Sequence, residues 1–492
     1  MSKPWLHEMR ITRAQLIFAV DALWLSAIFT LYMAPTKQHM GDLLATALLL
    51  GYLSVIGLRW LWITAALKPL IPLLGLLIFV LASDAFYGRS SGIEFIKDTA
   101  IGLIPFLLLY FVFRHFKIQQ VRFLAVAVFL IPGLIQLGYM YFDITKSIIN
   151  SKTAIVSVSA ENSWLLFRKK LEMKLPDGLP PQNKAGLLEN IKEAPRVGRR
   201  YASTAMIHLL WGGLLLAVLF RKRAVRYLGW GFAATGMLSL ALLDARAAYA
   251  SILIGGLIIA FIVDRSRLKS VINWITQGGR ARLITLIILV GLILAIGFSA
   301  GKSRWMSSSY SVHAAIHDVF DSNKVVGLRP YADKAFWDIP IENLDADDIE
   351  FRLRVDQSAY LRTAWLLVGL QNAVAHPLGI GYSNDYMSRI FGGGDDKYQR
   401  TDNFLVECLV SFGVAGVIFY ATLWWLVARS LRRALREGHD ASVILIAVGG
   451  IMFVCVGRGL VDVFSHGLWR YLMALLGMYY GLLHAGRQRA RE

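Results

Sequence analysis

The sequence predicts an all-α protein that crosses a membrane many times. Of its 492 residues, 56% are hydrophobic, and the mean hydropathy is +0.52. A soluble chain of this length does not need so much apolar surface for its core. About twelve apolar stretches are of roughly the length that a helix needs to cross the hydrocarbon layer. We therefore expect a polytopic helical membrane protein.

The apolar stretches fall into three groups, separated by two long polar segments. The predicted spans are 14–33, 43–63, 70–82, 99–113, 123–142, 204–220, 227–243, 247–263, 283–299, 405–427, 441–456 and 468–483. The third and fourth are the weakest of these signals because they are short. This grouping predicts transmembrane regions at 1–143, 204–299 and 404–492, with long loops at 144–203 and 300–403.

Basic residues fall in alternate short loops, which predicts the orientation of the chain. The clusters lie before the first span, at 114–122, 221–226, 264–282 and 429–437, and after the last span. Lys and Arg in short loops favour the cytoplasmic side. Both termini are therefore predicted to be cytoplasmic, and both long loops to lie outside. The formal net charge of +19 then reflects orientation and contact with anionic membrane lipids, with no nucleic-acid partner.

No residue pattern in the sequence indicates a metal site or a bound cofactor. Cys408 and Cys455 both lie in apolar runs, and the ten histidines are scattered. No phosphate-binding or dinucleotide-binding glycine motif is present. We expect the protein to need neither a metal nor a cofactor.

The first long loop is basic, ending in "PRVGRR" with Arg199 and Arg200. Long loops escape the charge rule that orients short ones, so this charge needs another cause. A phosphorylated partner and anionic lipid headgroups are both open as explanations. Arg199 and Arg200 are therefore candidate binding residues.

Arg246 lies in "LLDARAAYAS", between the seventh and eighth predicted spans and near the outer face. An arginine at a membrane boundary is costly unless it is paired or functional. It could contact Asp244 locally or extend its side chain to the interface. Alternatively, it binds an anion together with the exposed N–H groups at the start of the next helix.

The second long loop contains a predicted amphipathic helix at about 355–374, at or near the membrane surface. Arg354, Ser358 and Arg362 recur at helical spacing and share one face. Arginine matches phosphate oxygens in a bidentate fork, so this face could bind a phosphate. The predicted apolar face carries Tyr360, Trp365, Leu367 and Leu370.

The segment "HPLGIGY" follows this helix. His376-Pro377 is predicted to stop the helix, and Gly379 and Gly381 to allow a tight return towards the membrane. A polar "TDN" triplet then leads into the span 405–427, where Asp402 is placed to cap the helix.

Together these features resemble the bacterial O-antigen ligase and polymerase superfamily. The resemblance rests on Arg246 before a span, on "SAYLR" and "HPLGIGY" in a long outer loop, and on "DNFL" and "FGVAG" in the following span. It implies a GT-C-like polytopic glycosyltransferase of the inner membrane with a periplasmic active site. The donor would be a glycan on undecaprenyl diphosphate. The acceptor would be a glycolipid, either lipid A–core in a ligase or a second lipid-linked glycan in a polymerase.

The resemblance also implies roles for individual residues. Arg246 and Arg362 match the arginines taken to hold the donor diphosphate, with Arg354 and His376 as further substrate-binding candidates. The family usually has His-Asn where this chain has Asp402-Asn403, so Asp402 would be the general base and Asn403 a substrate contact. The transfer would be metal-independent and would invert the anomeric centre. His376 and His466 are alternative bases, and Asp402 as a helix cap alone is another alternative.

Two further functions remain open from the sequence. A transporter of polyprenyl-linked sugars would share the many spans, but such proteins often show internal repeats and broken helices at the midplane. Neither is visible in this sequence. A non-catalytic assembly partner is the other possibility, because the family histidine is absent.

Overall fold

The computed structural model describes most of the helical part of the chain. The described residues are 13–33, 37–56, 66–87, 91–115, 118–153, 199–220, 222–242, 246–262, 309–320, 355–382, 403–437, 441–459 and 466–489, with the short pieces 64, 343, 348–349 and 351. They are helices and turns, and they contain no strand. The prediction of an all-α fold is therefore confirmed.

The predicted spans coincide with helices, except for 283–299, which lies outside the described residues. The helices are α1 (Arg13–Tyr32), α2 (Gln38–Ile56), α4 (Ile71–Tyr87), α5 (Ser91–His115), α6 (Ile118–Thr153), α9 (Arg199–Leu219), α10 (Arg223–Leu242), α11 (Arg246–Ile262), α18 (Phe404–Arg436), α19 (Ser442–Gly459) and α20 (His466–Arg489). A 3-10 turn, η1 (Lys68–Leu70), leads into α4. The second long loop contains α16 (Gln357–Ala375) and a shorter helical segment at 309–320.

Several helix boundaries differ from the sequence prediction. α2 begins at Gln38, before the predicted start at residue 43, and α6 continues to Thr153, well beyond residue 142. α9 begins at Arg199, so Arg199 and Arg200 lie in its first turn. Hydropathy marks only the part of a helix that is apolar, and it misses polar turns that extend beyond the membrane.

Four helical segments within the described residues are long and apolar enough to cross a membrane. They are Lys68–Tyr87, Gly92–His115, Gln119–Tyr141 and Phe404–Arg436. The first two correspond to the predicted spans 70–82 and 99–113, which gave the weakest signals in the sequence because they are short. Shorter apolar helices occur at Phe18–Tyr32, Ser203–Leu219, Ala250–Ile262 and Ser442–Gly457. The chain is therefore a multi-pass membrane protein.

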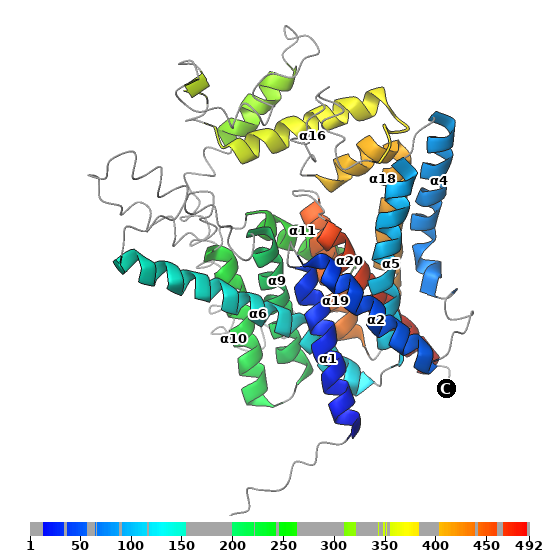
Figure 1. Cartoon of the computed structure of the whole chain (residues 1–492), viewed down its shortest axis with the longest axis vertical. Helices are drawn as coiled ribbons and strands as arrows, with labels where there is room; N and C mark the ends of the chain where they lie inside the picture. Colours follow the sequence, from blue (N-terminus) through cyan, green and yellow to red (C-terminus); the bar gives the residue numbers. More distant parts are fainter. Residues whose placement is uncertain are drawn as a thin grey trace, which may run out of the picture.

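Close helix packing holds the bundle together (Figure 1). The most extensive contacts join α5 to α20, α9 to α10, α6 to α9 and α11 to α19. In the first of these pairs, Gly477 and Gly481 of α20 lie against the backbone of Phe106 and Tyr110 of α5. Helices in a membrane associate largely through such close backbone approach, which small residues allow.

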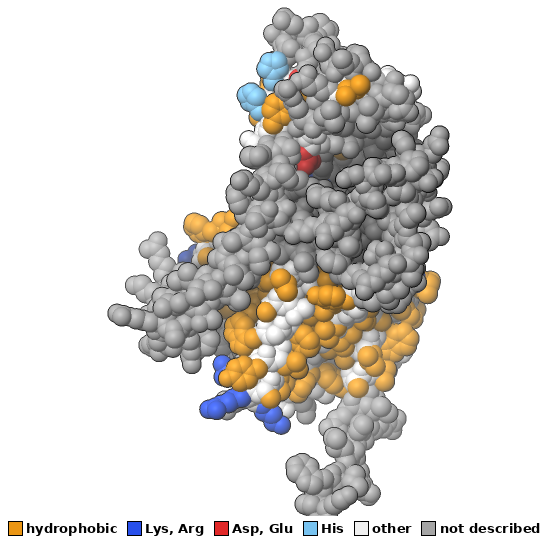
Figure 2. Space-filling view, turned by 90° about the vertical axis from the view of Figure 1, so that its left-hand side faces the viewer, with side chains coloured by type: hydrophobic (Ala, Val, Ile, Leu, Met, Phe, Trp, Pro, Cys, Tyr) orange, Lys and Arg blue, Asp and Glu red, His pale blue; other side chains and the backbone are white. Residues whose placement is uncertain are grey.

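The two ends of the bundle differ in character. α16 lies across one end, crosswise to α4 and α5 (Figure 1). On the face shown in Figure 2, apolar side chains form a broad band with Lys and Arg side chains at its lower edge. On α10, Leu228 and Trp230 are exposed, and so are Lys222 and Arg223 at its beginning. An apolar band bounded by basic residues is the surface expected where a protein meets lipid.

Candidate active site

Helix α18 is broken near its beginning. Gly413 has φ 64° and ψ −156°, a conformation that only glycine adopts readily, and it interrupts the helical backbone. The residues before the break, 404–412, are called the entry segment below. Asn403 caps this segment, because its side-chain oxygen accepts hydrogen bonds from the N–H groups of Leu405 (3.0 Å) and Val406 (3.1 Å). The N-cap is therefore Asn403, and the expectation that Asp402 occupies this position is wrong.

The segment "HPLGIGY" docks against this break. The N–H groups of Ile380 and Gly381 donate to the carbonyl oxygens of Val410 (2.8 Å) and Ser411 (3.1 Å). In the opposite direction, the N–H of Val414 donates to the Pro377 carbonyl oxygen (3.0 Å). A helix break leaves backbone groups without their usual partners, and a buried backbone group without a partner is costly. The docked turn supplies partners for these groups.

Two glycines make this close approach possible. Gly379 has φ 80°, and a Cβ atom there would overlap the Ser411 carbonyl. A Cβ atom on Gly413 would overlap the Pro377 carbonyl. The sequence prediction that this turn is tight and glycine-dependent is confirmed, as is the end of α16 at Ala375 with His376 as its C-cap.

Tyr382 anchors the end of the turn to two transmembrane helices. Its hydroxyl donates to Asp98 Oδ2 of α5 at 2.6 Å. Its ring stacks on Phe412 of the entry segment, with centroids 5.7 Å apart and planes 5° from parallel. Phe95 of α5 packs edge-on against the Tyr382 ring. The turn, α5 and α18 therefore meet at one point.

Helix α16 is fixed over the entry segment. Asp356 caps its beginning, and the Asp356 N–H donates to Ser311 Oγ (2.8 Å) of the helical segment at 309–320. The Tyr360 hydroxyl donates to Asp318 Oδ2 (2.7 Å) of the same segment. A buried cluster then joins α16 to the entry segment, formed by Tyr360, Leu361, Ala364, Trp365, Val406 and Val410 with Ala315 and Val355.

The buried face of α16 differs in part from the predicted one. Tyr360 and Trp365 are buried as expected, but Leu370 is 40% exposed. Leu361 and Ala364 are buried in its place. The face is rotated because α16 packs between two neighbours, the 309–320 helix and the entry segment, and not onto a single flat surface.

Three of the predicted site residues, Arg246, Arg362 and His376, lie on helices α11 and α16, which contact α18, or at the end of α16. Arg362 is half-buried on α16, and α16 packs on α18. Arg246 is the first residue of α11, which also contacts α18. His376 is exposed at the end of α16. Asp402 and Arg354 lie outside the described residues.

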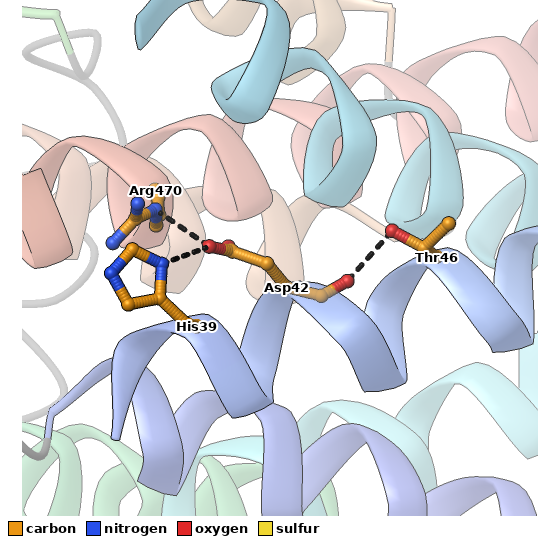
Figure 3. Close-up of polar contacts among 4 residues, drawn as sticks. All are labelled: His39, Asp42, Thr46 and Arg470. Atoms are coloured by element: carbon orange, nitrogen blue, oxygen red, sulfur yellow. Dashed lines mark hydrogen bonds and ion pairs between the residues drawn. The ribbon is translucent and has the colours of Figure 1, made fainter.

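Three polar features of the bundle escaped the sequence analysis. The first is the Asp98–Tyr382 hydrogen bond described above. The second is Glu407, a buried carboxylic residue in the entry segment. The third is an ion pair between α2 and α20, in which Arg470 Nε lies 3.2 Å from Asp42 Oδ2 (Figure 3). Glu407 and Arg470 both lie inside predicted spans, where a charged residue is a signal of function or pairing.

Figure 3 shows how the Asp42–Arg470 pair is arranged. Arg470 is almost fully buried, and Asp42 is only slightly exposed. His39 approaches the same carboxylate oxygen at 3.8 Å but is itself exposed. The Thr46 hydroxyl donates to the backbone carbonyl of Asp42 at 2.7 Å. The pair therefore joins the start of α2 to the start of α20 inside the protein.

Comparison with known proteins identifies the segment that builds this assembly. Residues 236–421 match the model of the family described as O-antigen ligase. This matched segment, which is similar to that family, is called the ligase domain below. The domain runs from within α10 to beyond the break in α18, so it contains α11, α16, the docked turn and the entry segment. No curated protein matched the chain.

The match confirms the resemblance to the O-antigen ligase and polymerase superfamily. It indicates a glycosyltransferase-like membrane enzyme of ligase or polymerase type. The ligase domain includes Arg246, Arg354, Arg362, His376, Asp402 and Asn403. Arg199 and Arg200 lie before it.

Proposed function

We propose that the protein transfers a glycan from undecaprenyl diphosphate to a glycolipid acceptor on the periplasmic side of the inner membrane. The observation that carries the proposal is the coincidence of the O-antigen ligase domain with the assembly of α16, the docked turn and the broken helix α18. The basic clusters in alternate loops support this orientation, with both termini in the cytoplasm. A donor carried on a polyprenyl chain would reach the assembly from the lipid.

Two arginines would hold the donor diphosphate. Arg246 begins α11, so its charge adds to the N–H groups exposed at a helix N-terminus. Arg362 comes from α16, and Arg354 precedes that helix. Negative charge grows on the diphosphate as the bond to the sugar breaks, and fixed guanidinium groups stabilise the transition state more than the ground state.

The acceptor would approach from the other side of the sugar. The proton acceptor would lie in the first turns of α18 or directly before them, where the sequence offers Asp402 as one candidate. Asn403 can contact a substrate only through its amide NH2 group, because its oxygen caps the helix. His376 is exposed near the turn, and Arg199 and Arg200 at the start of α9 would receive acceptor phosphates. Lipid A–core is the phosphorylated acceptor that this arrangement favours.

The decisive experiment is transfer by the purified protein in lipid nanodiscs. The donor is an undecaprenyl-diphosphate oligosaccharide, and the acceptor is lipid A–core or a second molecule of the lipid-linked oligosaccharide. Release of undecaprenyl diphosphate with glycosylated lipid A–core supports the ligase. Glycan elongation on the lipid carrier identifies a polymerase. Translocation without cleavage contradicts the proposal and identifies a transporter.

Variants then test the arginines. Arg246→Ala and Arg362→Ala should each lower the transfer rate by at least about 100-fold, the size of effect seen when one transition-state donor is removed. Arg429→Ala is the matched control, since Arg429 is an exposed arginine near the far end of α18 and lies over the Trp425 ring. Full activity in either arginine variant would discard the diphosphate site.

A further inference from the structure

The entry segment of α18 carries a polar stripe. Asn403, Glu407 and Ser411 recur every fourth residue, so they lie on one face of the helix. Glu407 is 8% exposed and Ser411 is 5% exposed. The stripe starts at the N-cap and ends beside Gly413, where the helix breaks. Its last two members, Glu407 and Ser411, are therefore buried polar residues at the start of an otherwise apolar helix.

The neighbouring faces show where this stripe points. Val406 and Val410, on one side of it, pack against α16. Cys408 and Phe412, on the other side, belong to the core of the transmembrane bundle. Glu407 and Ser411 project between these two faces, because successive residues of a helix are turned by about 100°. The stripe thus follows the seam between α16 and the bundle.

Two elements assigned to the donor contact α18. α16 carries Arg362, and α11, which begins at Arg246, also contacts α18. The docked turn closes the inner end of the seam, because its Gly381 N–H binds the carbonyl oxygen of Ser411. Glu407 therefore occupies the middle of a polar face that extends from Asn403 to the docked turn.

A carboxylate at this position has a large energetic cost if it only fills space. An apolar residue would pack there at no such cost, and ionisable groups inside membrane proteins are rare and usually functional. A carboxylate also has the chemistry that glycosyl transfer requires, which is a proton acceptor held in a water-poor site.

We propose that Glu407 is the catalytic carboxylate that accepts the proton of the acceptor hydroxyl, a role that rests on the proposed glycosyl transfer. The acceptor O–H donates its proton to a Glu407 oxygen while the acceptor oxygen forms a bond to the anomeric carbon. The bond from that carbon to the diphosphate oxygen breaks, and its electron pair leaves with the diphosphate. Glu407 then returns the proton to water. Asp402, which precedes the N-cap in the sequence, then has no role in proton transfer.

The test is the kinetics of Glu407→Gln and Glu407→Asp in the nanodisc assay. Glu407→Gln keeps the shape of the side chain and removes the basic oxygen, so kcat should fall by at least about 100-fold, the lower range for loss of a general base. KM for the donor should change by less than about threefold, since the arginines still bind it. Glu407→Asp should keep part of the activity. The rate of the wild-type protein should fall at acidic pH, and the residual rate of Glu407→Gln should not.

Glu437→Gln is the matched control, because Glu437 is an exposed glutamate at the C-cap of the same helix. It should leave transfer unchanged. The thermal unfolding temperature of each variant is measured with and without added donor. A rise in this temperature on addition of the donor verifies that the variant folds and binds the donor. If Glu407→Gln retains kcat and the acidic decline while Asp402→Asn loses both, Asp402 is the base and the role of Glu407 is refuted. If the wild-type protein transfers no glycan, the proposed function itself has failed.

Discussion

The N–H of Val414 donates to the carbonyl oxygen of Pro377 at an N–O distance of 3.0 Å, although the two residues lie in separate segments of the chain. This hydrogen bond crosses the break in α18 and ties the turn after α16 to the transmembrane helix. Ile380 and Gly381 add two bonds in the opposite direction. These three hydrogen bonds form a joint between the turn at 377–381 and the broken helix α18 within the ligase domain.

Gly413→Ala should disrupt this joint. The alanine Cβ would overlap the Pro377 carbonyl, and the backbone conformation at Gly413 costs other residues about 1–3 kcal/mol. We expect a lower thermal unfolding temperature in detergent and little transfer activity. Gly231→Ala is the control, since a Cβ on Gly231 of α10 meets no atom within 4 Å. An unchanged unfolding temperature for Gly413→Ala would contradict the broken-helix geometry.

Tyr382→Phe should distinguish the effect of the Tyr382 hydrogen bond to Asp98 from the effect of ring packing. It removes the hydrogen bond to Asp98 and keeps the stacked ring on Phe412. The loss of one hydrogen bond to a charged group corresponds to about 1.5–3 kcal/mol. We expect lower thermal stability and a lower transfer rate. Tyr139→Phe, at an exposed tyrosine of α6, should change neither. Equal stability of the two variants would show that the Asp98 bond does not anchor the turn.

Arg470→Met should destabilise the bundle more than loss of an exposed ion pair. It leaves the Asp42 carboxylate inside the protein without its cation, at a cost of about 3–5 kcal/mol. Arg433→Met breaks the exposed Arg433–Glu437 pair, which is worth at most about 1 kcal/mol. The double variant Asp42→Leu/Arg470→Met should recover part of the loss. Chemical unfolding of the single and double variants measures the coupling, and additive effects would show that the pair is not coupled.

Asn403 variants should distinguish helix capping from substrate contact. Asn403→Ala removes the cap and should cost about 1 kcal/mol of stability. Asn403→Ser retains a capping oxygen but has no amide NH2 group. If Asn403 also binds substrate, Asn403→Ser should fold normally and raise KM in the transfer assay. An unchanged KM would limit Asn403 to its structural role.

The sequence predicted the positions of the helices better than it predicted the contacts between segments. Apolar runs are local, so hydropathy located the spans, and Pro377, Gly379 and Gly381 marked a real turn. The helix break at Gly413 and the docking of the turn were not predicted, because they depend on backbone groups about thirty residues apart in the chain.

The errors at individual residues have similar causes. The cap of α18 is Asn403 and not Asp402, a shift of one residue at a helix end. Leu370 is exposed because the position of the 309–320 helix decides which face of α16 is buried. Glu407 and Arg470 were missed because each lies inside an apolar run. Hydropathy averaged over a whole span changes little when a single charged residue is included.

The joint between the turn and α18 has a consequence for how related chains diverge. Its three hydrogen bonds use only main-chain atoms, so they place no demand on most of the side chains around them. Side chains that border the seam can therefore be exchanged while these main-chain hydrogen bonds remain intact. Glycine spacing, more than chemical identity along the loop, should then be the signature that distant members share.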